Sequence, residues 1–339
     1  MRRDTLPLDR IADLHNLASA FHAAASGKRG RPDLEQFRDR LDDSLADLRR
    51  DILAGTVRVG EARSFRIRDP KPRQIHAPVF RERVLHHAIM AHAGPVLDRS
   101  LIFDTYACRL GKGSLAAVRR VKAHAGQFAW FTQIDIDGYF AHIDHEVLLS
   151  LLARTFRDRD LLALFGRIVA AHRAAHGRGL PIGALTSQHF ANFYLAAVDR
   201  LIMEDPRVRG MVRYMDDLIW WTDDRAQGQA VLADVRAYLR DRLKLTIKKP
   251  PREGPSRHGV VFCGFRIQCN RLLLTRRRKR RYQQLRRAAE TAWSREEIDG
   301  LGLQAAYAPA LALTVHADAL SWRREELRRH PPALALDDA

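Results

Sequence analysis

The sequence predicts an α+β fold in which helices precede, interrupt and follow a small number of antiparallel strands. Three observations support this class. Apolar residues recur at helical spacing within residues 9–55, a period-two alternation marks residues 130–137, and two apolar runs flank an acidic turn at 214–217. The chain of 339 residues exceeds a typical single domain, so we expect two or three subdomains.

The N-terminal element, residues 1–60, is expected to be helical. Its apolar positions follow helical spacing over 11–21 and again over 34–48. A glycine-containing break at 27–32 separates the two stretches. The sequence therefore predicts a small helical element at this end of the chain.

A basic strand-turn-strand unit follows. Residues 64–68 and 74–77 alternate like strands, and Asp69 and Pro70 begin the turn between them. We expect a helix over 81–93 after the second strand.

The segment 130–137 is predicted to be a core strand. Its alternation places Phe131, Gln133, Asp135 and Asp137 on one face and the intervening side chains on the other. Asp135 therefore ends a core strand and faces the same way as Asp137.

The second half of the chain is predicted to alternate between helices and short strands. Ser187 can cap a helix that continues to Leu201, and another helix over 226–243 follows the acidic turn. Strands are expected at 245–247, 260–262 and 265–267, a basic helical region from 272 onward, and a disordered tail from 331.

The acidic turn is the most informative stretch of the sequence. Asp216 and Asp217 lie between the apolar runs at 211–212 and 218–221. Carboxylates removed from water need a cation or dense hydrogen bonding, so acids at the tip of a hairpin indicate a metal site. A structural turn is the alternative, although two-residue hairpin loops favour Asn-Gly or Asp-Gly. The other Asp-Asp pairs have polar neighbours and are interpreted as solvated: 42–43, 223–224 and 337–338.

Asp135 and the acids at 216–217 together predict a two-metal site for phosphoryl transfer. In such sites carboxylates hold two ions about 4 Å apart, which stabilise the attacking and leaving oxygens. Mg²⁺ is the expected ion because it prefers carboxylate, water and phosphate oxygens.

Charge is the strongest global signal. The chain carries 58 Lys and Arg against 40 Asp and Glu, a net charge of +18. Such an excess predicts a polyanionic partner, and a solvated surface in an arginine-rich proteome is the alternative. The densest cluster, expected to neutralise backbone phosphates without reading sequence, is Arg276, Arg277, Arg278, Lys279, Arg280 and Arg281.

Other classes of protein are disfavoured. The three cysteines, Cys108, Cys263 and Cys269, are too scattered for a disulfide framework or a zinc site. No apolar run approaches the roughly 20 residues of a membrane span, and the first residues lack the apolar stretch of a signal peptide. We therefore expect a soluble, cytoplasmic protein without a membrane partner.

Several ordered motifs resemble those of the reverse transcriptases of bacterial retroelements, over residues 63–329. Residues 135–140 and 143–145 resemble the first catalytic motif of that family, and residues 214–217 resemble the second. The other motifs are, in chain order, segments similar to the fingers at 71–75, 80–88 and 105–113, Gly264-Phe265 similar to the primer grip, and arginine-rich helices similar to the thumb.

The resemblance implies an RNA-directed DNA polymerase with a right-hand fold. After the N-terminal element, the fingers would span 61–129, the palm 130–270 with an insertion at about 151–180, and the thumb 271–330, before a tail at 331–339. The partners implied are a template RNA, a DNA or RNA primer and dNTPs. A small basic helical accessory protein or a structured RNA is expected for priming.

The resemblance also assigns the metal site. Asp135, Asp216 and Asp217 would be the catalytic acids. Together with Ile136 they would hold two Mg²⁺ ions.

Further residues of the nucleotide site follow from the same resemblance. Lys71 and Arg73 would contact the triphosphate, which requires a basic fingertip. Phe140 takes the place of the aromatic residue that excludes a ribose 2′-OH, with a core phenylalanine as the alternative. Lys248 would protonate the leaving pyrophosphate, and its neighbour Lys249 could serve equally.

The segment 182–188 indicates a subgroup. Where retroviral and group II intron enzymes usually carry Gln-Gly-x-x-x-Ser-Pro, this chain has Ile182, Gly183 and, in place of the proline, Gln188. That pattern resembles diversity-generating retroelements, whose enzymes copy a template RNA with errors at adenines. All three residues are expected to lie at the nascent base pair.

Other functions remain as alternatives. Defence-associated and unclassified bacterial reverse transcriptases share the 182–188 pattern. A non-catalytic RNA-binding scaffold would use the basic surface alone, but clustered acids without a metal would repel one another. An RNA-directed RNA polymerase shares the palm, and Phe140 argues instead for deoxynucleotides.

Overall fold

The structure, a computed structural model, describes residues 3–28, 30–68, 72–171, 177–248 and 250–332. Its secondary structure is mixed, with helices on both sides of antiparallel strands, so the α+β class is confirmed. No helix among the residues so described is long and apolar enough to cross a membrane.

The N-terminal element is helical, as predicted. Its helices pack around the longer helix α5 (Phe80–Asp98), and Phe21, Phe37 and Phe80 form an aromatic cluster with ring centroids 5.3–5.8 Å apart. The glycine-containing break separates the second helix from the third. The four helices are α1 (Leu8–Ile11), α2 (Leu14–Ala25), α3 (Pro32–Asp39) and α4 (Leu41–Leu53).

The two basic strands are confirmed and extend beyond the predicted ends. β1 (Ala62–Arg68) and β2 (Pro72–Pro78) pair antiparallel, with Phe65 opposite Ile75. The following helix, α5, runs five residues past the predicted end because it continues through Pro95, whose carbonyl accepts from the backbone N–H of Arg99. A proline one turn before the end of a helix removes one hydrogen bond there and does not stop the chain from continuing.

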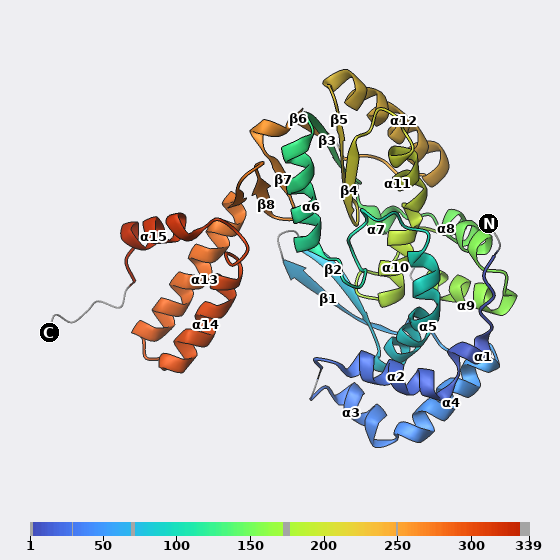
Figure 1. Cartoon of the computed structure of the whole chain (residues 1–339). Coiled ribbons are helices and arrows are strands. Elements are labelled where there is room, and N and C mark those ends of the chain that lie inside the picture. The colour runs from blue at the N-terminus through green and yellow to red at the C-terminus, as the bar shows by residue number, and fades with distance from the viewer. Residues whose placement is uncertain (1–2, 29, 69–71, 172–176, 249, 333–339) are drawn as a thin grey trace.

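A four-stranded antiparallel sheet forms the centre of the molecule (Figure 1). Its strand order is β4-β5-β3-β6, and the sheet separates two hydrophobic cores. Alternation explains the division: Ile134 packs into one core and Phe131 into the other. The strands are β3 (Trp130–Asp135), β4 (Gly210–Tyr214), β5 (Asp217–Thr222) and β6 (Arg252–Pro255).

Helices cover both faces of this sheet. α12 (Arg225–Leu243) packs on β3 and β5, and α6 (Ser114–Gln127), which the sequence did not predict, packs on β4. The remaining helices of this region are α7 (Tyr139–His142), α8 (His145–Thr155), α9 (Arg159–Ala170), α10 (Leu185–Tyr194) and α11 (Ala196–Met203).

The prediction that Ser187 caps a helix is wrong. α10 begins at Leu185, Ala184 is its N-cap residue, and Ser187 is buried in the first turn. The predicted single helix to Leu201 is also interrupted at Leu195, where α10 ends and α11 begins. The N-cap position is taken by Ala184, whose side chain cannot accept a hydrogen bond, so this helix start has no side-chain cap.

Two of the short strands were predicted correctly. β7 (Val260–Phe262) and β8 (Phe265–Ile267) pair in a separate three-stranded sheet, after the 3₁₀ turn η1 (Ser256–His258). The expected strand at 245–247 is wrong, because only Ile247 forms a bridge, with Ile136. The expected helix from 272 starts four residues later, because Leu272–Leu274 is the third strand, β9.

The C-terminal region is a group of three helices beside the β7-β8-β9 sheet (Figure 1). α13 (Arg276–Ser294) carries the arginine run and packs along α14 (Gly300–Ala312), and α15 (Leu320–Arg329) follows. Within the expected tail, residues 333–339 lie outside the described part of the chain.

Candidate active site

Antiparallel pairing brings the predicted acids together at one edge of the central sheet. Asp135 ends β3, Asp217 begins β5, and the two residues are partners across the strands. Asp216 precedes Asp217, and its carbonyl accepts a hydrogen bond of 3.3 Å from the N–H of Ile136. Asp135 lies close enough to Asp216 for its carboxyl group to raise the pKa of the Asp216 carboxyl.

The tip of the hairpin differs from the prediction. Tyr214 pairs with Asp217, so the two-residue loop consists of Met215 and Asp216 instead of the two aspartates. Met215 has a φ of 57°, a left-handed conformation that bulky residues adopt rarely and at an energetic cost. Asp217 pairs with Tyr214 across the hairpin and with Asp135 on its other side, so the second acid belongs to the strand β5.

Burial and mutual repulsion raise the pKa of two of these acids. Burial raises the pKa of Asp216 to about 6, and the charge of Asp135 adds to the effect while Arg73 opposes it. Burial raises the pKa of Asp217 to about 7, and the charges of the other two acids contribute. Gln133 opposes that rise by donating a hydrogen bond of 2.7 Å to Asp217 Oδ1. The site therefore favours a proton or a cation between its carboxylates.

The donor set fits a hard divalent cation in part. Asp135 and Asp216 present neighbouring carboxylate oxygens, the ligands that Mg²⁺ prefers. The side chain of Ile136 is a hydrocarbon without a donor atom, so only its backbone carbonyl is a candidate ligand. Across the described ranges, no group of three or more His, Cys, Asp or Glu side chains is arranged to hold a metal ion.

Lysine and arginine side chains lie near the acids. Lys248 Nζ is 3.4 Å from Asp135 Oδ2, and its backbone N–H donates to the Asp135 carbonyl at 2.8 Å. Arg73, on β2, is near enough to Asp216 to oppose the rise of its pKa. Lys71 and Lys249 lie outside the described residues.

Phe140 lies five residues after Asp135, in the short helix α7. Its ring is half-buried and meets Tyr139 edge to face, with centroids 5.7 Å apart. The carbonyl of Phe140 accepts a hydrogen bond of 2.7 Å from the N–H of Leu180. The segment before Ile182 is therefore fixed against the chain that follows Asp135.

The segment 182–188 connects two other elements. The Ile182 carbonyl accepts from the N–H of His76 on β2 at 2.8 Å. Gly183 has a φ of +121°, and a Cβ there would lie 2.8 Å from the His76 carbonyl oxygen, so glycine is required. Gln188 Oε1 accepts from the thiol of Cys108 at 3.6 Å, in the loop before α6.

The arginine run divides into two groups. Arg278 is half-buried, its guanidinium lies 3.8 Å from the centroid of the Phe265 ring, and it donates to the Leu313 carbonyl at 3.4 Å. Arg278 therefore joins α13 to the β7-β8-β9 sheet. By contrast Arg276, Arg277 and Lys279 line a pocket.

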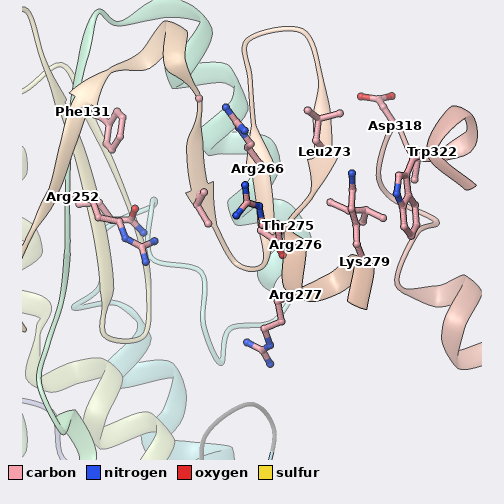
Figure 2. A pocket seen from close by; sticks show the side chains of 15 residues that line it. Phe131, Arg252, Arg266, Leu273, Thr275, Arg276, Arg277, Lys279, Asp318 and Trp322 are labelled. Carbon is pink, nitrogen blue, oxygen red and sulfur yellow. The ribbon is translucent and has the colours of Figure 1, made fainter. Parts of the chain in front are cut away.

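This pocket, of about 650 Å³, lies between the central sheet and α13 (Figure 2). Arg252 and Arg266, which the sequence did not single out, add two cations to it. Phe131 and Gln133 line it from β3, and they share the strand face that ends at Asp135. The pocket therefore opens on the same side of the sheet as the acids, with Trp322 at its far wall (Figure 2).

Comparison with known proteins agrees with the motifs. Residues 68–250, more than half of the chain, match the family described as reverse transcriptase (RNA-dependent DNA polymerase). The group II intron-encoded protein LtrA of Lactococcus lactis subsp. cremoris is 23% identical over 140 residues, which are 40% of this chain and 23% of that protein. Protein YkfC of Escherichia coli strain K12 is 24% identical over 275 residues, 67% of this chain and 72% of that protein.

Among solved structures, apo telomerase from Candida tropicalis, truncated from its C-terminal domain, aligns with a TM-score of 0.46 and 11% identity, over 62% of this chain and 53% of that one. A likeness of this degree supports no conclusion. The chain also spans less than a quarter of the length of LtrA, so the activity and partners of the whole protein are matters for proposal. The match over 68–250 establishes that the chain belongs to the reverse transcriptase family.

Proposed function

We propose that the chain is an RNA-directed DNA polymerase that adds deoxynucleotides to a primer on a template RNA. The observation that supports this activity most is the pair of carboxyl groups of Asp135 and Asp216, held together by antiparallel strands. Family membership supports the class of reaction.

The proposed fold is a right hand. In this assignment residues 1–60 precede the fingers at 61–129, the palm spans 130–270 with an insertion at about 151–180, and the thumb spans 271–330. The central sheet with its acids is the support for the palm. The three basic C-terminal helices support the thumb.

The reaction extends the primer by one nucleotide. The primer 3′-oxygen attacks the α-phosphorus of a dNTP, the bond from that phosphorus to the bridging oxygen breaks, and pyrophosphate leaves. Asp135 and Asp216 would hold two Mg²⁺ ions, with the Ile136 carbonyl and Asp217 completing the site. When bound, the ions supply positive charge to the attacking and leaving oxygens.

Residues around the acids are proposed to bind and select the incoming nucleotide and to assist its reaction. Arg73 and Lys71 bind the triphosphate, and Phe140 excludes the 2′-OH of a ribonucleotide. Lys248 protonates the leaving pyrophosphate, a role supported by its position 3.4 Å from Asp135, and Lys249 is the alternative.

The pocket beside the acids is proposed to take the duplex of template and new strand. Its five cations neutralise backbone phosphates, and such contacts position a duplex without reading its sequence. These residues are Arg252, Arg266, Arg276, Arg277 and Lys279. The solvent-exposed Arg280 and Arg281 extend the same basic surface along α13.

The subgroup proposed is the diversity-generating retroelements, on the strength of Ile182, Gly183 and Gln188. Sequencing of cDNA made by the wild type and by Ile182→Gln on one template tests it. We expect errors at template adenines and fewer of them in Ile182→Gln. An equally low error at all four bases would favour a defence-associated or unclassified reverse transcriptase. An accessory protein and a cytoplasmic location stay predictions.

The activity itself is tested by primer extension on matched RNA and DNA templates with dNTPs or NTPs. We expect extension on RNA with dNTPs. Extension with NTPs alone would indicate an RNA polymerase, and tight RNA binding without extension would indicate a scaffold.

A further inference from the structure

A buried ion pair contacts the turn formed by residues 214–217, called the catalytic turn here. Arg213 is on β4, two residues before Met215, and Asp199 is on α11. Neither side chain is exposed to solvent at all. The guanidinium donates to both carboxylate oxygens of Asp199 at 2.6 Å, so the buried charges are paired.

The guanidinium has an acceptor for each of its N–H groups. Besides the two bonds to Asp199, Nη1 donates to Asn192 Oδ1 at 2.8 Å and Nη2 to the Asn192 carbonyl at 3.0 Å. The last donor, on Nη1, reaches the carbonyl of Met215 at 3.0 Å. A lysine at this position has fewer donors and lacks the planar fork, so it cannot make the same set of bonds.

The bond to Met215 restrains the peptide that precedes Asp216. Met215 is in the left-handed conformation, with a φ of 57°, which the surroundings must stabilise. The peptide that follows Asp216 is held separately, because the Asp216 carbonyl accepts from the N–H of Ile136. Both peptide planes next to Asp216 are therefore fixed by hydrogen bonds.

The same cluster is tied to the loop before α6. Thr105 Oγ1 donates to Asp199 Oδ2 at 2.8 Å, and Asn192 Nδ2 donates to the Ala107 carbonyl at 2.8 Å. The backbone N–H of Arg213 donates to the Asp104 carbonyl at 2.9 Å. The position of Arg213 is thus set from three directions, by α10, by α11 and by this loop.

We infer that Arg213 is a positioning residue for Asp216, an inference that rests on the proposed polymerase activity. Arg213 holds the Met215 carbonyl and so orients the carboxylate of Asp216 toward Asp135. Asp199 and Asn192 orient Arg213 in turn. Sequence alone gives no sign of this role, since a charged residue on a strand ordinarily faces solvent.

A second buried ion pair provides a matched control. Arg286 and Glu290 on α13 are 3.1 Å apart, with side chains 1% and 5% exposed. Arg286 Nη2 donates to the His330 carbonyl, within the group of C-terminal helices. Arg286→Lys therefore perturbs an equally buried arginine that contacts no residue of the catalytic turn.

The test compares Arg213→Lys with Arg286→Lys in single-nucleotide incorporation on an RNA template, with thermal unfolding of each variant. We expect kcat of Arg213→Lys to fall about 100-fold with KM for the dNTP unchanged, because misplacement of a catalytic group by about 1 Å costs that much. Arg286→Lys should lower the unfolding temperature and leave kcat unchanged. If the unfolding temperature falls equally in both variants and kcat of Arg213→Lys stays at the wild-type value, the inference is overturned.

Thr105→Val serves as a milder variant if Arg213→Lys does not fold. It removes one hydrogen bond to Asp199 and leaves the ion pair intact. We expect a smaller fall in kcat with unchanged KM, and a wild-type kcat would overturn the inference. A wild-type protein that does not polymerise would instead contradict the proposed function.

Discussion

Replacement of Asp216 by asparagine should stabilise the metal-free protein and abolish DNA synthesis. The pKa of Asp216 in the folded protein is about 6, against an ordinary value of 3.8. The folded state therefore disfavours the charged carboxylate. A group whose pKa is raised on folding contributes stability that is present below pH 3.8 and is lost as the pH rises through about 6.

The magnitude follows from the two pKa values. The difference between about 6 and 3.8 corresponds to up to about 3 kcal/mol of unfolding free energy at pH 8. Asparagine has nearly the same shape and no charge, so Asp216→Asn avoids this cost. We expect the variant to exceed the wild type in stability by about 1–3 kcal/mol at pH 8 and by at most about 0.5 kcal/mol at pH 4.

Guanidinium unfolding at both pH values, with EDTA present, measures this difference. Asp223→Asn is the control, because the exposed Asp223 pairs with Arg209 and its pKa is lowered instead of raised. Its substitution should lower stability at pH 8. If Asp216→Asn is less stable than the wild type at pH 8, or if the difference does not vary with pH, burial does not raise the pKa of Asp216.

Three further predictions concern other parts of the molecule. Burial lowers the pKa of His124 to about 4, so between pH 6.5 and 4 the wild type should lose up to about 3 kcal/mol of unfolding free energy relative to His124→Leu, measured by denaturation at each pH. The double variant Arg276→Gln, Arg277→Gln should weaken binding of an RNA–DNA duplex uniformly across sequences and flatten the salt dependence of that binding. Arg278→Gln should mainly lower the unfolding temperature. The same salt dependence in the double variant and in Arg278→Gln would contradict this division. Phe140→Ala should raise incorporation of ribonucleotides relative to deoxynucleotides in competition assays, and an unchanged ratio would assign Phe140 to the core.

The placement of the candidate acids side by side could be predicted because local patterns mark the ends of their strands. The alternation in β3 ends at Asp135, and the apolar runs around 214–217 predict a hairpin. The residues at the tip could not be predicted. The loop depends on the pairing of Tyr214 with Asp217, and the apolar runs on either side do not specify which residues of 214–217 pair.

Short apolar runs gave the errors in the fold. The segment 245–247 has strand-like composition and forms only one bridge, whereas the run at 272–274 was expected to be helical and pairs with β8. Three apolar residues satisfy either period, and only their tertiary partners decide between them. Arg278 was grouped with the neighbouring arginines because its contact with Phe265 is a tertiary contact, which the local sequence does not show.

The role of Asp216 as a metal ligand is tested most directly by incorporation of one dNTP on an RNA template in the presence of Mg²⁺. The wild type and Asp216→Asn are compared, with Asp223→Asn as control. We expect incorporation by the wild type and by Asp223→Asn, none above background by Asp216→Asn, and equal affinity of all three for the duplex. Undiminished incorporation by folded Asp216→Asn would contradict that role.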